Sequence, residues 1–179
     1  MATISKSTEK TFYALALVRI SLGFIFLWAF LDKLFGLGFA TCRDTQTDAV
    51  NTMCSRAWAE GGSPTTGFLG NAVQGPFADL YHNLAGVAIV DWLFMAGLLV
   101  VGVGLLLGIW VRVAAVVGAI MLFLMWTALL WPENNPFMDD HLVYVFALAA
   151  VYFGDTNQKW GLRAWWSQTG LVKVLPLLK

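Results

Sequence analysis

The chain has 179 residues, of which 59% are hydrophobic, 15% are aromatic and only 12% are charged. A water-soluble domain carries about 25% charged residues, so most of this surface must face something other than water. The mean hydropathy of +0.70 agrees with that conclusion. The formal net charge is zero and no basic run follows one face, which argues against nucleic acid as a partner. The composition also excludes a disordered chain.

Three apolar segments are long enough to cross a bilayer, because a helix rises about 1.5 Å per residue and the hydrocarbon layer is about 30 Å thick. They are residues 12–33, 87–109 and 113–131. The first segment is also a candidate secretory signal peptide, since Lys6 and Lys10 precede it. Its length and the internal Arg19 favour a retained membrane anchor.

A fourth apolar segment, residues 142–154, is too short to span the layer by itself. We expect it to extend back to residue 137, which would place Asp139, Asp140 and His141 below the lipid headgroups. The fold class expected is therefore all-α, an integral membrane four-helix bundle in a single domain over residues 1–179.

The distribution of basic residues predicts the orientation in a cell membrane. With the N-terminus and C-terminus both cytoplasmic, seven basic residues lie inside and three lie outside. Those inside are Lys6, Lys10, Arg112, Lys159, Arg163, Lys173 and Lys179, and those outside are Lys33, Arg43 and Arg56. Arg19 lies about 10 Å from the inner end of its helix, where it either snorkels to the headgroups or meets a partner in the bundle.

Two segments outside the spans have their own character. Residues 34–86 form an outer loop, and its second half mixes helix breakers with apolar residues, which predicts short interfacial helices lying as a lid over the bundle. Residues 155–179 mix tryptophan and leucine with lysine and arginine, which is typical of a cytoplasmic amphipathic tail lying on the membrane.

A series of motifs resembles one family. Residues 19–33 read RISLGFIFLWAFLDK, with an arginine, a glycine four residues on, a Phe-Leu pair and a terminal lysine. This pattern resembles the first helix of the DoxX/DoxD membrane family. Later segments resemble the DoxD branch in the same order along the chain: GSPTTGFL at 62–69, GPF at 75–77, VDWLF at 90–94, LGIWVR at 107–112 and NPFMDDH at 135–141.

The resemblance implies a four-helix membrane protein and, for the DoxD branch, a subunit of thiosulfate:quinone oxidoreductase. Such an enzyme oxidises thiosulfate to tetrathionate and reduces a membrane quinone. The family enzyme has two subunits, so the resemblance also implies a second oxidoreductase subunit as a partner. The alternative is a non-catalytic membrane anchor or scaffold subunit of a larger oxidoreductase or respiratory complex.

Ionisable residues near the outer ends of the spans are the candidate catalytic groups, because charges in spans are costly and often mark proton paths or ligand sites. They are Asp32, Lys33, Asp91, Asp139, Asp140 and His141. Clustered carboxylates raise one another's pKa, which suits proton delivery to a quinone. The structural alternative is that Lys33 pairs with Asp91 while Asp139 and Asp140 cap the fourth helix.

Four residues, one of them His141 again, are candidate quinone contacts, because a quinone ring needs a flat apolar surface and hydrogen-bond donors. They are Trp28, His82, Trp92 and His141. Lys33 and His82 are also placed to attract a thiosulfate dianion. We predict no metal or haem, since the sequence lacks the usual ligand motifs.

Cys42 and Cys54 lie in the outer loop, where the compartment permits disulfides. One hypothesis is a structural bridge that closes the loop. The other is a redox pair that takes a sulfur adduct from thiosulfate.

Overall fold

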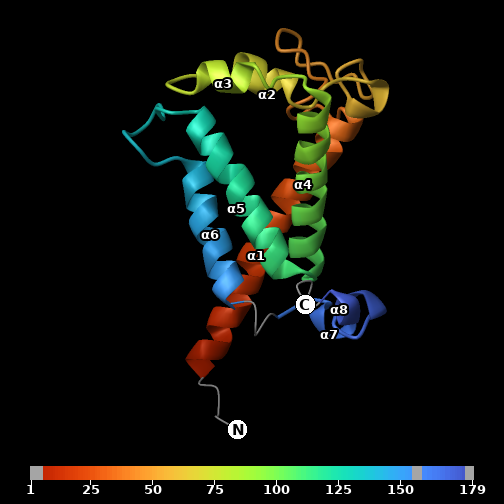
Figure 1. Cartoon of the computed structure of the whole chain (residues 1–179), viewed down its shortest axis with the longest axis vertical. Coiled ribbons are helices and arrows are strands. Elements are labelled where there is room, and N and C mark those ends of the chain that lie inside the picture. The colour runs from red at the N-terminus through yellow and green to blue at the C-terminus, as the bar shows by residue number, and fades with distance from the viewer. Residues whose placement is uncertain (1–5, 155–158, 176–179) are drawn as a thin grey trace.

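The first apolar segment forms one long helix, α1 (Lys6–Phe35), in the computed structural model, which describes residues 6–154 and 159–175. Two more long helices follow the outer loop, α4 (Ala88–Leu107) and α5 (Val111–Ala128), joined by a tight turn (Figure 1). In the described part of the chain these three helices are long and apolar enough to cross a membrane. The spans predicted by hydropathy therefore correspond to α1, α4 and α5 within a few residues.

The fourth helix, α6 (Asp140–Gly154), is shorter and begins three residues later than the predicted start at residue 137. The reason is an alternative use of the backbone amides before it. The side-chain Oδ1 of Asn135 accepts hydrogen bonds from the amides of Phe137 at 2.9 Å and Met138 at 2.5 Å, so these residues form a turn. At about 1.5 Å per residue, the 15 residues of α6 cover about 22 Å.

The helices pack as two closely associated pairs, α1 with α4 and α5 with α6, and α4 also packs on α5. The α1–α4 pair approaches closely because Gly23 and Gly102 lie at the crossing. A Cβ atom on Gly23 would lie 2.5 Å from the amide nitrogen of Leu106, and one on Gly102 would lie 2.6 Å from that of Leu27. The buried residues between the helices are Leu22, Phe26, Met95, Leu98, Val101, Leu105, Val111, Ala114, Ala115, Leu122, Leu148 and Val151.

Apolar side chains also cover the outside of the helices, which fits contact with a lipid bilayer. Leu17, Phe24, Ile89, Ile120 and Phe146 are all more than half exposed on α1, α4, α5 and α6. A water-soluble protein does not display such a surface on every long helix, so these faces match lipid as their solvent.

Short helices occupy the two ends of the molecule (Figure 1). At one end, residues 36–87 carry a 3₁₀ helix, η1 (Trp58–Glu60), and the helices α2 (Thr66–Asn71) and α3 (Ala78–His82). At the other end, beside the turn between α4 and α5, lie α7 (Arg163–Trp166) and α8 (Gly170–Val174). Part of the predicted tail, 155–158 and 176–179, lies outside the described residues.

Candidate functional site

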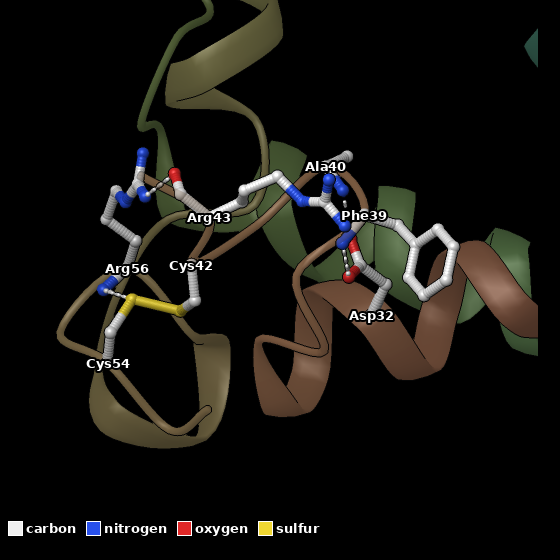
Figure 2. The surroundings of a disulfide bond; sticks show 7 residues. All are labelled: Asp32, Phe39, Ala40, Cys42, Arg43, Cys54 and Arg56. Atoms are coloured by element: carbon white, nitrogen blue, oxygen red, sulfur yellow. Dashed lines mark hydrogen bonds between the residues drawn. A yellow bond between two sulfur atoms is a disulfide. The ribbon is translucent and has the colours of Figure 1, made fainter. Parts of the chain in front are cut away.

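We call the end of the molecule that carries η1, α2 and α3 the lid end. A buried carboxylate, Asp32, lies there near the end of α1 and is only 1% exposed. Its two carboxylate oxygens accept hydrogen bonds from the amides of Phe39 at 3.0 Å and Ala40 at 2.9 Å (Figure 2). Because both oxygens hold loop backbone, Asp32 shapes the turn that leaves the helix.

A disulfide joins Cys42 and Cys54 across this loop (Figure 2). Cys42 is buried, and a Cβ atom on Gly36 would lie 2.3 Å from its sulfur, so the bridge packs tightly on the end of α1. The pairing that the sequence left open is therefore present as a bond.

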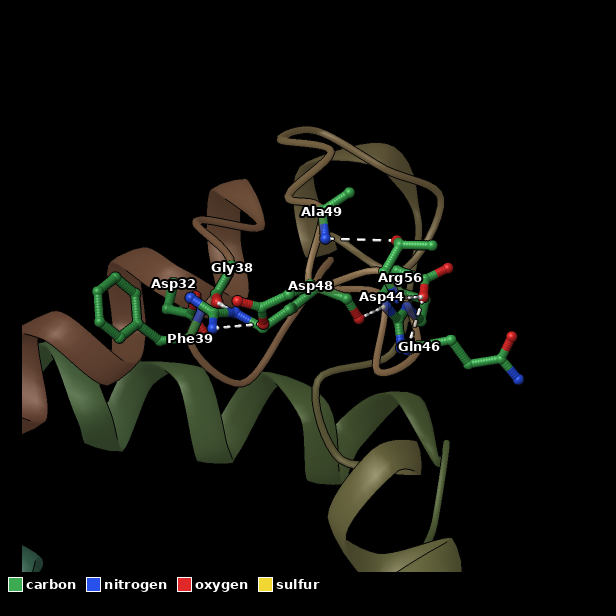
Figure 3. Close-up of polar contacts among 10 residues, drawn as sticks. Asp32, Gly38, Phe39, Asp44, Gln46, Asp48, Ala49 and Arg56 are labelled. Atoms are coloured by element: carbon green, nitrogen blue, oxygen red, sulfur yellow. Dashed lines mark hydrogen bonds and ion pairs between the residues drawn. The ribbon is translucent and has the colours of Figure 1, made fainter.

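Polar contacts order the rest of the disulfide loop (Figure 3). Arg43 donates from Nε to the Gly38 carbonyl at 2.6 Å and pairs with Asp48 at 2.8 Å. Asp44 Oδ1 accepts the amides of Gln46 at 2.8 Å and Thr47 at 2.9 Å. These backbone hydrogen bonds stabilise the carboxylate and lower the pKa of Asp44 below its ordinary value.

We call residues 61–86, which carry α2 and α3, the lid. Asp91, in the first turn of α4, holds the beginning of the lid and is only 7% exposed. Its Oδ1 accepts hydrogen bonds from the Ser63 hydroxyl at 2.9 Å, the Thr65 hydroxyl at 2.5 Å and the Thr65 amide at 3.2 Å. The Thr65 hydroxyl oxygen also accepts the amide of Gly86 at 3.2 Å. Both ends of the lid segment thus meet at one carboxylate and one hydroxyl.

Lys33 does not take part in that network. Among the described residues it forms no ion pair with Asp91, which was one prediction from the sequence. Its ammonium group lies 5.9 Å from the centre of the Phe94 ring, a cation–π contact between α1 and α4. Asp91 instead receives neutral hydroxyl and amide donors.

An apolar cavity of about 270 Å³ lies between the lid, α4 and α5. The two helices meet at their turn and diverge toward the lid end, and α2 and α3 cross above them (Figure 1). Thr65 belongs both to the cavity wall and to the Asp91 network. The lining consists of Pro64, Thr65, Phe68, Leu69, Tyr81, Leu84, Val90, Leu93, Phe94, Met121, Leu124, Met125 and Ala128.

The other predicted acidic residues form a separate group at the start of α6. Asp139 accepts the amide of Leu142 at 3.1 Å, which caps α6, and its other oxygen lies 2.7 Å from Nδ1 of His141. Asp140 is exposed in the first turn. The start of α6 lies beside α5, on the side away from α4, so it is well separated from the start of α4 (Figure 1). The structure therefore divides the six predicted catalytic residues between two places.

The predicted quinone contacts also lie outside the cavity lining. Trp28 packs edge-on against Phe39 with ring centres 5.1 Å apart. Trp92 is exposed and meets Trp58 in the same manner at 4.6 Å. His82 is exposed at the end of α3.

The sequence did not point to the residues that line the cavity, because apolar residues in the lid and the spans have the same pattern as residues that only pack in a core. Thr65, Tyr81, Met121 and Met125 are examples. One signal was available, since Ser63 and Thr65 are closely spaced hydroxyl residues in a loop that precedes a span with a single carboxylate. Within the described residues no group of three or more His, Cys, Asp or Glu residues is placed to hold a metal ion.

Arg19 lies toward the opposite end of the molecule and is fully buried, so of the two alternatives from the sequence the structure has a partner within the protein, and snorkelling to the headgroups was wrong. Its Nη1 donates to the carbonyls of Leu105 and Leu106 at the end of α4. Its Nη2 donates to the carbonyls of Lys159 and Trp160, at 3.1 and 3.0 Å. Carbonyls at a helix C-terminus lack partners within the helix and carry partial negative charge, so they attract the guanidinium more strongly than distant headgroups do.

No family model, curated protein or solved structure matches this chain. The likeness to the DoxX/DoxD family accordingly stands on the ordered motifs of the sequence. Two of these motifs contribute to the lid end, because residues 62–69 hold Ser63 and Thr65 and residues 90–94 hold Asp91. They supply both sides of the hydrogen-bond network described above.

Proposed function

We propose that this chain is a DoxX/DoxD-like membrane subunit that couples thiosulfate oxidation to quinone reduction at the lid end. Two thiosulfate ions join through their outer sulfur atoms to form tetrathionate and release two electrons. One quinone accepts those electrons with two protons and becomes a quinol. The observation that carries the proposal is the apolar cavity whose wall shares Thr65 with the buried Asp91 carboxylate.

The proposal includes a membrane arrangement. Helix α6 makes the fourth crossing. Because it is short, the bilayer around it becomes thinner, or the polar residues at its ends extend toward the headgroups. The start of α1 and the segment carrying α7 and α8 face the cytoplasm, in agreement with the excess of basic residues there. The lid end then faces outward, where disulfides form.

The two reactants divide between the cavity and the surrounding water. An apolar cavity disfavours a dianion, because removing an ion from water without a partner is costly. Thiosulfate therefore binds on the exposed surface of the lid end, where His82 and Arg56 are exposed. Lys33, which the sequence suggested for this role, is half-buried against Phe94 and is less accessible to the anion. The quinone ring is uncharged and suits the cavity.

Asp91 is the proposed proton relay for the quinone: it takes up protons one at a time from the water outside and passes each on through the Thr65 hydroxyl that it holds. Asp32 stabilises the turn after α1, and Lys33 stabilises the contact between α1 and α4. Asp139, Asp140 and His141 are the alternative proton source, and their position at the start of α6 makes them less suited to a quinone in this cavity.

The second candidate is a scaffold subunit for a partner oxidoreductase. The observation that favours it is a pair of exposed apolar residues in the lid, Phe77 and Leu80, which are 45% and 59% exposed. A partner chain docked on the lid would cover them.

The deciding experiment is turnover by the purified protein with thiosulfate and a short-tailed quinone analogue, measured as quinol absorbance and tetrathionate formed. We expect turnover, a large loss in Asp91→Asn, and little change in Asp79→Asn on the exposed face of α3. Turnover that appears only after a second chain is added supports the scaffold. Equal activity in both variants contradicts the role of Asp91.

A further inference from the structure

The exposed part of the cavity wall belongs to the apolar helices α4 and α5. Two lining residues are well exposed, Leu93 on α4 at 66% and Leu124 on α5 at 49%. Both lie within helices long enough to cross a membrane. A molecule that passes between these two leucines reaches the cavity from the bilayer.

The opposite side of the cavity is closed by the lid, which is fastened to both helices. Tyr81 on α3 donates its hydroxyl to the Leu124 carbonyl at 3.0 Å, and the Gln74 amide donates to the Ala128 carbonyl at 3.2 Å. Asp91 holds the other edge of the lid through Ser63 and Thr65. Access from water along the helix axis is therefore restricted in comparison with access from the side.

We propose that this cavity is a lateral binding site that takes the ring of a membrane-dissolved quinone entering between Leu93 and Leu124, with the tail left in the bilayer. The identity of the ligand rests on the proposed function, whereas the site and the route rest on the geometry. The ring contacts Phe94 and Met121 inside the cavity.

The size and chemistry of the cavity select a ring over other bilayer molecules. At about 270 Å³, the cavity lies just below the roughly 300–1,000 Å³ of sites for drug-sized ligands, which leaves room for one substituted ring and not for a long tail. Aromatic rings and methionine sulfurs make favourable contacts with a flat ring. The lining supplies both, in Phe68, Phe94, Tyr81, Met121 and Met125.

Two residues that line this almost wholly apolar cavity carry hydroxyl groups, which lie behind its surface. Thr65 and Tyr81 both line it, and both hydroxyls are held in hydrogen bonds to protein acceptors in the ligand-free chain. A hydroxyl can rotate to donate to a quinone carbonyl, whereas a hydrocarbon chain offers no acceptor. A ring with carbonyl oxygens therefore gains a hydrogen bond if either hydroxyl turns from its protein acceptor toward the cavity, and a hydrocarbon chain does not.

The test is photolabelling of the full chain in lipid nanodiscs with a short-tailed azidoquinone, without thiosulfate, followed by peptide mapping. We expect labelling of α5 around Met121 and Met125 or of lid residues 64–84, suppressed by excess unlabelled quinone. Leu124→Trp at the opening should weaken the labelling about tenfold, because the larger side chain narrows the space between α4 and α5. Leu93→Trp should act in the same way from the α4 side.

The matched control is Ile120→Trp, which places the same bulk on an exposed position of α5 outside the cavity lining and should leave labelling unchanged. Labelling of the wild-type chain elsewhere overturns the site, even if the leucine variants do not fold. Equal competition by an alkane without a ring assigns the cavity to lipid tails and overturns the ligand. Correct labelling without turnover would retain this site and reject the proposed function, and turnover without labelling would do the reverse.

Discussion

The hydroxyl of Thr65 lies 2.5 Å from the carboxylate of Asp91 and joins the lid to α4. Replacing Asp91 with alanine removes the carboxylate that accepts hydrogen bonds from the Ser63 hydroxyl and from the hydroxyl and amide of Thr65. Hydrogen bonds to charged groups contribute about 1.5–3 kcal/mol each, so we expect the lid to open more readily. The measurement is limited proteolysis of residues 61–86 in detergent.

Asp79→Ala is the control for that measurement, because Asp79 is exposed on α3 of the same lid. The Asp91→Asn variant keeps one side-chain oxygen as an acceptor and should fall between the wild type and Asp91→Ala. Proteolysis at the same rate in all these proteins would show that Asp91 does not hold the lid.

Arg19→Lys tests whether the guanidinium fork is needed at the opposite end. Lysine keeps the charge but concentrates its donors at one point, so it cannot reach the carbonyls of α4 and of Lys159 and Trp160 together. We expect a loss of at least about 2 kcal/mol in the free energy of unfolding, measured by denaturation in mixed micelles. Arg112→Lys, at an exposed position where lysine keeps the charge beside the Tyr152 ring, should change it by less than about 1 kcal/mol, and equal effects would refute the clamp.

The double variant Cys42→Ser and Cys54→Ser removes a bridge between residues 12 positions apart. A closed loop of about 15 residues contributes about 3 kcal/mol by restricting the unfolded chain. We expect faster proteolysis of the outer loop with unchanged helix content and unchanged quinone reduction. Loss of turnover in a fully assembled protein would instead support the redox hypothesis for these cysteines.

Asp44 predicts a pH dependence in the disulfide loop. Its pKa in the folded protein is depressed below the ordinary value of 3.8 by the amides of Gln46 and Thr47. The stabilisation is therefore fully present above pH 3.8 and is lost as the pH falls through the lower, folded pKa. A carboxyl titration by NMR should show a midpoint below 3.8, and the Gln46 and Thr47 amide shifts should move with it.

The Asp44→Asn variant keeps a side-chain oxygen and lacks the titration, so its two amide shifts should be constant over the same range. A midpoint of the Asp44 carboxyl at or above 3.8 would mean that the turn does not hold the ionised form.

Hydropathy was sufficient to place the long helices, because lipid imposes a minimum length of apolar residues and excludes charge. The same reasoning also placed Asp32, Asp91 and Asp139 near one end, since position along a span follows from residue number. It did not separate them around the molecule. Helix α6 packs mainly on α5, and nothing in the composition of α6 indicates that neighbour.

The partners of the buried charges were also beyond prediction from the sequence. Arg19 meets carbonyls 86 and 140 residues further along the chain. Backbone acceptors are present at every residue and leave no mark in the sequence. The lone Asp91 was recognisable as unusual, but charge alone suggested Lys33 as its partner where the protein uses hydroxyl groups.

The contacts of Arg19 have a consequence for how the protein is made. The first helix leaves the ribosome long before Lys159 and Trp160 are synthesised, so its arginine cannot gain all its acceptors until the last stretch of the chain has emerged. A nascent chain truncated before residue 159 would carry a buried cation with half of this set missing. Completion of translation is thereby linked to the final seating of the first helix, which gives quality control a means of distinguishing finished chains from fragments.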